Sequence, residues 1–391
     1  MMYKNKSVLT FFYFLLIAQY CFSQDMKFIP YRFKDLWGFS DTKGNVILPT
    51  RYQQANPFSE GYAVIESDNH FSFIDDDGDL KMPFKYDYIS NFHNNVAVVS
   101  LAEKWKVIDT RAHVLTKNDY DAIGEFSNGL AQVKAANQYG FINDKGDIVV
   151  KPQFDNVLPF SENMAVVQSG NLFGFVNQKG FIVIPVQYEG AASFHDGLAL
   201  VKKDSLVGFI DKSNNAVIPF QYKSANIFSE GLAPVMKDGK VGFINTKGDV
   251  EIPIQYENAN PFREGFALVQ KNGLLGYIDK KGHEIIAPEF NIADDFHEGF
   301  ALVKDSSWKF VNAEGEKLML DIHYQEVKDF SNGLARVKGN EVWGYVNQSG
   351  NEIIERKYED AQDFNNGYAL VKLNGKWGYI DKTGKEFFKE K

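Results

Sequence analysis

The chain has 391 residues, of which 44% are apolar and 24% charged, and its formal net charge is −9. This composition is typical of a globular protein and excludes a largely disordered one. The acidic balance argues against nucleic acid and anionic membrane surfaces as partners, because both repel a negatively charged protein.

Residues 1–23 have the layout of a secretory signal peptide. Two lysines precede an apolar run at 8–18, and polar residues follow it. The run is shorter than the roughly 20 apolar residues of a membrane-spanning helix, and no later segment is apolar enough to cross a membrane. We expect cleavage after Ser23, which leaves a mature chain of 24–391. We also expect the signal peptide to direct export to the periplasm, the cell surface or the medium.

The only cysteine, Cys21, falls within the expected signal peptide. The mature chain would then contain no thiol, which excludes a disulfide framework, a catalytic cysteine and a thiolate metal site. Lipidation of Cys21 is the alternative, but Gln19 and Tyr20 do not match the small residues that such a site requires. Cleavage would also remove Lys4 and Lys6 and take the net charge from −9 to −11.

The remaining chain is an internal repeat with a period of 34 residues. Phenylalanine recurs without exception from Phe58 to Phe364, and an alanine follows each one five residues later, from Ala63 to Ala369. A period this strict is the signature of one supersecondary unit that stacks on its neighbours.

Each unit contains a segment in which an apolar or aromatic residue is usually followed by glycine. The second residue is not glycine at Ser72, Lys106 and Lys309, and we expect these units to pack or curve differently. The eleven segments are Trp37-Gly38, Phe71-Ser72, Trp105-Lys106, Tyr139-Gly140, Phe173-Gly174, Val207-Gly208, Val241-Gly242, Leu275-Gly276, Trp308-Lys309, Trp343-Gly344 and Trp377-Gly378.

One unit predicts three short strands. Residues 367–373 and 376–381 alternate between the two faces of a strand, and "KEFF" (385–388) or "NEII" (351–354) supplies the third. Helical periodicity is missing throughout the mature chain. The sequence therefore predicts an all-β protein.

Two turns of the unit are also predicted. Asp or Asn opens the turn between the second and third strands in all eleven units, and glycine follows three residues later except at Ala112 and Asn214. A type I turn that ends in a residue with positive φ fits this pattern. In the "FSEG" loop (58–61) the last position is always Gly or Asn, which also indicates positive φ.

This pattern resembles the WG-repeat (KWG-repeat) family of bacterial proteins. The blocks that carry the resemblance are "GKWGYIDKTGKE" (375–386), "FSEGLAPV" (228–235) and "VIPFQY" (217–222), and they recur from about Phe28 to the end. The resemblance implies a β-rich repeat protein, often exported. It implies no common reaction and supplies no catalytic residues.

A single unit is too small to bury a core, so neighbouring units must share one. We expect about eleven three-stranded units in an open, superhelical array over 24–391, with 24–36 as a partial first repeat and the "KEK" tail as a polar cap. The alternative is a closed β-propeller. Propellers typically have about four to eight four-stranded blades, which fits eleven three-stranded units less well.

Two stretches of the sequence could indicate a metal site, but neither has a complete set of ligands. Asp321 and His323 could share a face and hold a metal, but no third ligand is evident. The "DDDGD" run at 75–79 lacks the spacing of a calcium loop and fits the standard turn of the repeat. We therefore predict no metal, no cofactor and no catalytic residues, and the ligand-binding residues stay unassigned.

Five tryptophans share one repeat position and could stack on sugars. The same position holds Val207, Val241 and Leu275 in other units, which favours a core role. The tryptophans are Trp37, Trp105, Trp308, Trp343 and Trp377.

The leading functional hypothesis is an exported, non-enzymatic protein that offers a repeated surface to a protein or glycan partner, with variable loops such as 161–164 and 263–266 setting specificity. The alternative is a cell-wall or surface-glycan binding protein that uses the tryptophans. A third hypothesis places a hydrolase or metal centre at 305–323, where the repeat is irregular.

Overall fold

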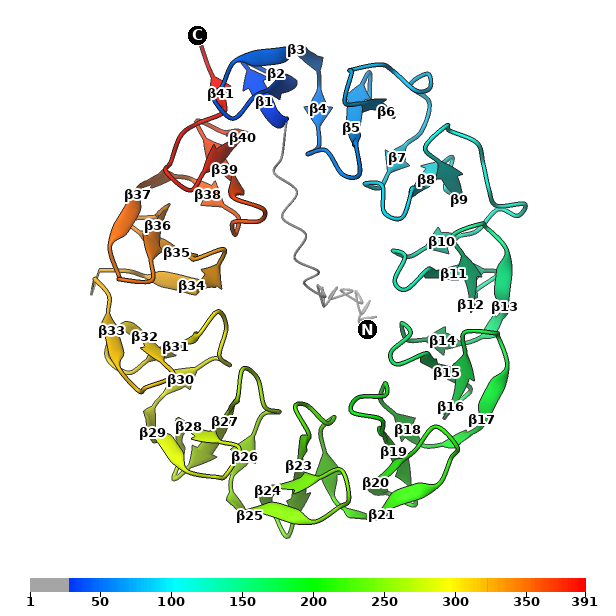
Figure 1. Ribbon diagram of the computed structural model, residues 1–391, viewed down its shortest axis with the longest axis vertical. Helices are drawn as coiled ribbons and strands as arrows, with labels where there is room; N and C mark the ends of the chain where they lie inside the picture. The colour runs from blue at the N-terminus through cyan, green and yellow to red at the C-terminus, as the bar shows by residue number, and fades with distance from the viewer. Residues whose placement is uncertain (1–27, 322) are drawn as a thin grey trace, which may run out of the picture.

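The computed structural model describes residues 28–321 and 323–391, and every regular element in them is a β-strand. The strands form eleven sheets that follow one another around a closed ring, as the blades of a propeller do (Figure 1). This described part contains no helix that is long and apolar enough to cross a membrane. The expected signal peptide, 1–23, lies outside the described residues.

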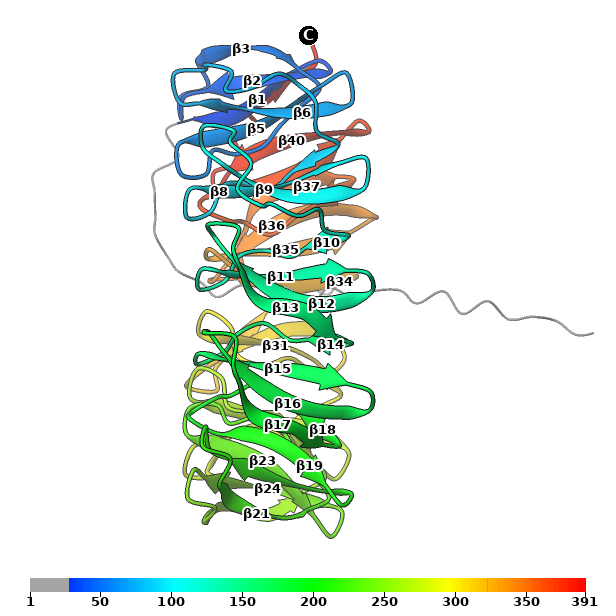
Figure 2. The ribbon, with the colours of Figure 1, turned by 90° about the vertical axis from the view of Figure 1, so that its right-hand side faces the viewer.

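Blade 4 shows the usual arrangement. Its four antiparallel strands are β10 (Ala122–Ile123), β11 (Leu130–Ala135), β12 (Gln138–Asn143) and β13 (Ile148–Phe154). The strands run across the thickness of the ring, so their two ends lie on its two opposite faces (Figure 2). The two-residue strand was not predicted from the sequence, because two residues carry no alternating pattern.

The other blades repeat this order with variations. Blade 1 contains β1 (Ile29–Phe33), β2 (Leu36–Ser40), β3 (Val46–Tyr52) and β41 (Phe388–Lys389); blade 2 contains β4 (Gln54–Ala55), β5 (Tyr62–Ser67) and β6 (His70–Asp75); blade 3 contains β7 (Tyr88–Ile89), β8 (Val96–Leu101) and β9 (Lys104–Asp109). Blade 5 contains β14 (Asn156–Val157), β15 (Met164–Ser169), β16 (Leu172–Asn177) and β17 (Ile182–Tyr188); blade 6 contains β18 (Gly190–Ala191), β19 (Ala199–Lys203), β20 (Leu206–Ile210) and β21 (Ala216–Tyr222); blade 7 contains β22 (Ser224–Ala225), β23 (Leu232–Lys237), β24 (Lys240–Asn245) and β25 (Val250–Tyr256). Blade 8 contains β26 (Asn258–Ala259), β27 (Phe266–Lys271), β28 (Leu274–Asp279) and β29 (Glu284–Phe290); blade 9 contains β30 (Ile292–Ala293), β31 (Phe300–Lys304), β32 (Trp308–Asn312) and β33 (Lys317–Met319). Blade 10 contains β34 (Glu326–Ser331), β35 (Leu334–Gly339), β36 (Val342–Asn347) and β37 (Glu352–Tyr358); blade 11 contains β38 (Asp360–Ala361), β39 (Tyr368–Leu373) and β40 (Lys376–Asp381).

The predicted turns are present. Asp41 Oδ1 accepts hydrogen bonds from the backbone N–H groups of Lys43 and Asn45, and Gly44 has a φ of 83°. At the same position Ala112 has a φ of 63° and Asn214 one of 67°. The "FSEG" loop is a two-residue hairpin with positive φ at both central residues, the geometry of a type I′ turn that matches the twist of its strands.

The hydrophobic cores lie between blades, as the small size of one unit requires. One core joins residues of blade 5, such as Phe175 and Ile184, to Phe194 and Ala199 of blade 6. The rings of Phe175 and Phe194 have centroids 5.0 Å apart, and Ala199 has no exposed surface. The recurring phenylalanine therefore fills the space between two sheets, and the recurring alanine lets them approach.

In seven blades the glycine of the "WG" segment makes room for the outer strand. A Cβ atom on Gly140 would lie 2.3 Å from the carbonyl oxygen of Val150, a distance that no side chain tolerates. The outer strand bulges at this point, since its pairing with β12 shifts register there. The same close approach, at 2.3–2.6 Å, occurs at Gly38, Gly140, Gly174, Gly208, Gly242, Gly276 and Gly344.

The three units without this glycine differ as expected. Blades 2 and 3, which carry Ser72 and Lys106, have three-stranded sheets, and their outer segments are irregular. Blade 9, which carries Lys309, keeps an outer strand of only three residues that pairs without a register shift. In these three blades loss of the glycine goes with a missing or shortened outer strand, whereas blade 11 keeps Gly378 and has three strands because β41 pairs with β1.

The ring is closed, so the expected open array is wrong and the alternative, a β-propeller, is confirmed. Strand β41 leaves blade 11 and pairs in parallel with β1 of blade 1, with Arg32 opposite Phe388 and Phe33 opposite Lys389. "KEFF" therefore does not form the predicted third strand of its own blade. The "KEK" tail joins blade 11 to blade 1, since Lys389 pairs with Phe33 and Glu390 with Arg32, and 29–36 belongs to a complete blade.

Closure depends on the rotation from one blade to the next, summed around the ring. The period of the repeat gives the number of units. It does not give the rotation between neighbouring blades, because that rotation depends on how the side chains of one blade pack against the next. Most blades also have four strands, where the repeat predicted three, and four-stranded units fit a propeller well.

A candidate binding hollow between blades 3 and 4

In blades 4, 9, 10 and 11 a lysine of the second strand lies over an aromatic ring of the third strand. Lys338 lies directly across from Trp343, with its ammonium 6.0 Å from the ring centroid. Lys304 and Trp308 make the same contact at 4.6 Å. A cation over an aromatic face is attracted by the electrons of the ring. The same arrangement holds Lys134 over Tyr139 at 5.3 Å and Lys372 over Trp377 at 6.0 Å.

Blade 3 lacks this lysine. Ser100 lies across from Trp105, in the position that a lysine holds opposite Tyr139, Trp308, Trp343 and Trp377. The rings of Phe71 and Phe173 face Glu66 and Gln168 instead. Trp37 has Arg32 across from it, so Trp105 alone among the five tryptophans faces a residue without charge. Within the described residues, no cation lies over the ring of Trp105. The ring of Tyr88, which pairs with Ser100 from the other side, packs against the partly buried Trp105 indole instead, with the ring centroids 5.4 Å apart.

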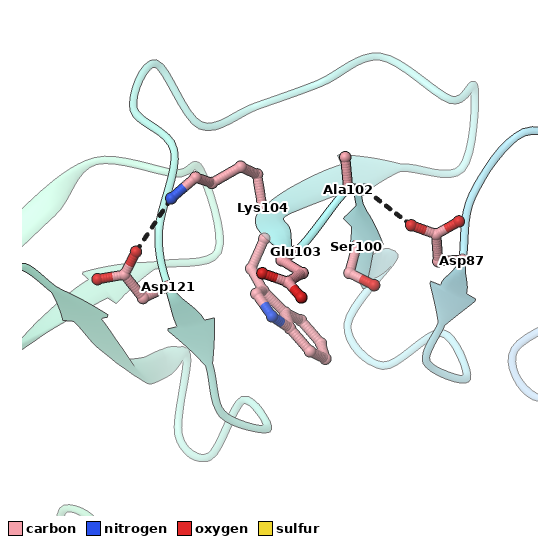
Figure 3. Close-up of a pocket in the computed structure, with 7 residues that line it drawn as sticks. Asp87, Ser100, Ala102, Glu103, Lys104 and Asp121 are labelled. Carbon is pink, nitrogen blue, oxygen red and sulfur yellow. Dashed lines mark hydrogen bonds and ion pairs between the residues drawn. The ribbon is translucent and has the colours of Figure 1, made fainter.

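An open hollow of ≈ 530 Å³ lies at this break, between blade 3 and the start of blade 4. Figure 3 shows Asp121 and Asp87 on opposite sides of the hollow, with Glu103 and Ser100 between them. The lining residues are Asp87, Ser100, Ala102, Glu103, Lys104, Trp105 and Asp121.

Two of the carboxylates in the hollow also support its walls. Asp87 accepts a hydrogen bond of 2.7 Å from the backbone N–H of Ala102. Asp121 accepts one of 3.1 Å from the Lys104 ammonium and one of 2.9 Å from the N–H of Ala136. The hydrogen bond from Lys104 is the main reason that the pKa of Asp121 lies below its usual range. Asp121 is therefore ionised at neutral pH.

Glu103 has no such structural role. Within the described residues its carboxylate has no hydrogen-bond or ion-pair partner. It occupies the second turn position of a two-residue hairpin, with a φ of 61°, where other blades have Gly239, Gly273 or Gly375. A glutamate is unfavourable in this backbone region, and here it adds an unpaired negative charge to the hollow.

A second hollow, of ≈ 470 Å³, lies on the other side of the segment that leads into blade 4. Asn118, Asp119 and Tyr120 contribute to its wall, as Asp121 does to the first hollow. This segment is irregular because Lys106 replaces the glycine that a bulged outer strand needs. The break in the repeat thus accounts for the hollowed surface of this part of the ring.

The variable "FSEG"-type loops have a structural role. The Glu60 carboxylate accepts hydrogen bonds of 2.8 Å from the N–H groups of Asn94 and Asn95 in the next loop. Glu264 does the same for the loop at Glu298 and Gly299. These acids link neighbouring blades, so the polar residues at 161–164 and 263–266 stabilise the ring, whatever else they contact.

The other candidate residues have structural explanations. Asp321 and His323 are brought together, with Nδ1 and Oδ1 2.7 Å apart, but in an exposed turn. Gly78 closes the turn that Asp75 opens, as predicted. No group of three metal-ligating side chains occurs within 28–321 and 323–391.

The tryptophans mostly belong to the core, as the valines and leucine at the same position indicated. Trp37 and Trp343 are buried, and Trp105, Trp308 and Trp377 are partly buried. Sequence reasoning missed the exception at Ser100. The signal was available, because a basic residue stands five positions before Trp37, Trp343 and Trp377, and four before Trp308.

No curated protein matches the chain in sequence. Among solved structures, a eukaryotic initiation factor is similar over 84% of this chain and 95% of its own, with 12% identity and a TM-score of 0.42. BamB from Moraxella catarrhalis is similar over 73% and 94%, with 11% identity and a TM-score of 0.34. The dihydro-heme d1 dehydrogenase NirN is similar over 70% and 75%, with 14% identity and a TM-score of 0.34.

The family of WG containing repeats matches ten times along the chain. The matches fall at residues 37–69, 71–105, 107–137, 139–173, 173–206, 208–240, 242–274, 276–306, 310–341 and 343–377. They cover most of the chain and follow the blades of the ring, so the chain belongs to the family of WG containing repeats.

Proposed function

We propose that this protein is an exported, non-enzymatic scaffold whose ring binds a macromolecular partner, a protein in the first place. The observation that carries the proposal is the hollow at Trp105, where residues that depart from the repeat lie together on the surface. Residues that keep to the repeat fill the cores or link the blades. A surface that differs from an otherwise regular ring is where a specific partner would be recognised.

The chemistry of the hollow favours binding over catalysis. Asp87 and Asp121 accept hydrogen bonds from backbone N–H groups, and Lys104 donates one to Asp121, so these side chains already have structural partners. A general acid or base needs a pKa near the working pH, and that of Asp121 is lowered instead.

A binding experiment tests this function. The chain 24–391 is immobilised and exposed to cell-envelope extract, beside a Ser100→Lys variant that gives blade 3 the lysine found at this position in blades 4, 9, 10 and 11. We expect one partner to be retained by the natural chain and lost with the variant. Equal retention by both chains would place the binding surface elsewhere, and retention of no envelope component would contradict the scaffold.

A glycan partner is the second candidate, because the partly exposed indole of Trp105 could stack on a sugar ring. Retention of the natural chain, but not the variant, on purified cell-wall polysaccharide would support it. Export is tested separately, by N-terminal sequencing of the protein recovered outside the cytoplasm. A chain that begins at Gln24 would agree with cleavage after Ser23.

A further inference from the structure

We infer that residues 385–391 form a displaceable strap, and that the place they occupy beside β1 binds an extended segment of a partner protein. The inference rests on the proposed scaffold function and names a second surface of the ring, with the kind of segment that fits it. The strap makes the junction between blades 11 and 1. At the other junctions the chain runs directly from one blade into the next, whereas here only non-covalent contacts join the two blades.

The strap has the sequence of an outer strand. "KEFFKEK" (385–391) corresponds to "NEIIERK" (351–357), most of which forms β37, the outer strand of blade 10. The strap also begins like an outer strand, because Glu386 lies opposite Ile380 in the register that the outer strand of blade 10 has. From Phe388 onward the strap pairs with β1 instead. Its sequence therefore suits a second position, along the outer edge of β40.

The outer edge of β40 keeps the features that receive an outer strand. Gly378 is the glycine that lies against a carbonyl oxygen of the outer strand in seven other blades, and here the ring of Phe388 fills that space. The carbonyl oxygen of Trp377 accepts a hydrogen bond from Arg32 Nε. In blades 2 and 3 the same carbonyl accepts one from an N–H of the outer segment. Arg32 and Phe388 therefore lie where an outer strand would otherwise pair.

The burial of Phe387 favours the position beside β1. Its side chain is 0% exposed and packs against Ile29 and Tyr31 of β1. At the same position of an outer strand, Ile353 is 43% exposed. Phe387 is therefore buried only while the strap lies on β1, and a partner segment with a large apolar residue at this point would replace it.

The strap also shows which polar contacts a partner segment must supply. The N–H of Arg32 donates to the carbonyl oxygen of Phe387 at 3.0 Å, and the N–H of Lys34 donates to that of Lys389 at 2.8 Å. Glu390 pairs with the Arg32 guanidinium at 2.7 Å. The paired stretch is only two residues long and parallel, the less stable arrangement of strands. An extended segment with an apolar residue, followed three positions later by an acidic one, would make the same contacts by strand addition.

A labelled peptide with the sequence of the strap, "KEFFKEK", tests the site, with its binding followed by fluorescence anisotropy. The chain 24–391 contains no cysteine, so the double variant Phe33→Cys, Lys389→Cys can form a single disulfide. These residues lie directly opposite one another, so the disulfide locks the strap onto β1. We expect the reduced chain to bind the peptide and the oxidised chain to bind it at least about tenfold more weakly.

Two substitutions test what holds the strap. Phe387→Ser in the chain should strengthen peptide binding by about tenfold, because the strap loses its buried ring while β1 is unchanged. Phe181→Ser is the control, since Phe181 is 65% exposed and lies in blade 5, and it should leave binding unchanged. Peptides that carry Phe387→Ser or Glu390→Gln should bind more weakly than the natural sequence does.

Thiol labelling shows where the displaced strap lies. Phe387→Cys should react faster once the peptide binds, because position 387 is exposed at the outer edge of β40. Phe388→Cys should stay protected, because Phe388 is 5% exposed beside β1 and the corresponding Ile354 of the outer strand is 3% exposed. Equal acceleration of both thiols would mean that the strap has no second position.

The outcomes separate the inference from the function on which it rests. Equal binding by the oxidised and reduced chains would place the peptide elsewhere and overturn the strap. Absence of binding even to the Phe387→Ser chain would overturn it as well. Failure of the scaffold itself would appear in the envelope experiment, as the absence of any retained partner.

Discussion

Arg32 Nε donates a hydrogen bond of 2.7 Å to the carbonyl oxygen of Trp377, and so joins the first blade to the last. Its guanidinium also pairs with Glu390 at 2.7 Å and lies over the ring of Phe388, 5.3 Å from the centroid. Arg32 is 2% exposed. A buried guanidinium is stable only when its donors are satisfied, and here both blades and the C-terminal strand satisfy them.

Replacing Arg32 with alanine should weaken the seam of the ring. Loss of a buried, charge-assisted set of hydrogen bonds costs about 3 kcal/mol. We expect the backbone amides of β1 and β40 to exchange hydrogen faster in Arg32→Ala, while those of blade 6 stay protected. Lys202→Ala is the control, because Lys202 holds the same repeat position in blade 6 and is exposed. Equal effects of the two variants would show that the seam does not depend on Arg32.

Adding one methyl group to a "WG" glycine should disrupt its blade. The Cβ atom of Gly140→Ala would meet the carbonyl oxygen of Val150 at 2.3 Å, which forces the outer strand away. Overpacking of this kind costs about 3 kcal/mol, at the upper end of the usual range. Gly190→Ala is the control, since its Cβ would lie 3.5 Å from the nearest neighbour. Chemical denaturation should show a loss for the first variant only.

Much of one blade could be predicted from the sequence, because local pattern decides it. Alternation gave the second and third strands, and the positions of glycine and asparagine gave both turns. The different packing of the units with Ser72, Lys106 and Lys309 was also predicted. Its cause, the carbonyl oxygen of the outer strand that lies against the glycine in other blades, is visible only in the structure. Closure was not predictable, because β41 pairs with a strand more than 350 residues away in sequence. The place of Ser100 could have been found from the sequence by comparing the residues four or five positions before each tryptophan, but the hollow beside it depends on how blades 3 and 4 pack.

The strained turn at Ala112 should be improved by glycine. Ala112 has a φ of 63°, a left-handed conformation in which the Cβ atom crowds the backbone. Relief of this strain outweighs the greater flexibility of glycine in the unfolded chain, so Ala112→Gly should stabilise the protein by about 0.5–1 kcal/mol. The reverse change at the same position of blade 1, Gly44→Ala, should destabilise it by a similar amount. Melting temperatures of the two variants check both signs, and a lower value for Ala112→Gly would contradict the strain.

Asp329, in β34, should make the stability of the ring depend on pH. Burial, together with the negative charge of Asp294, raises its pKa from 3.8 to about 6. Asp363 adds to this effect, whereas His297 and Arg263 oppose it. One carboxylate oxygen of Asp329 is buried without a hydrogen-bond partner among the described residues. The folded protein therefore holds this proton more tightly than the unfolded chain does.

A raised pKa in the folded state fixes the direction of the effect. Its stabilising contribution is complete below pH 3.8 and is lost as the pH rises through about 6. Asp329→Asn cannot ionise, so it should be more stable than the natural chain at pH 7.5, by about 1–2 kcal/mol after allowing for partial contact with water. The advantage should fade as the pH falls through 6 towards 4. Urea denaturation across this range measures the difference, and Asp238→Asn, in an exposed turn, controls for the substitution itself. A difference that stays constant from pH 4 to 7.5 would mean that Asp329 keeps an ordinary acidity in the ring.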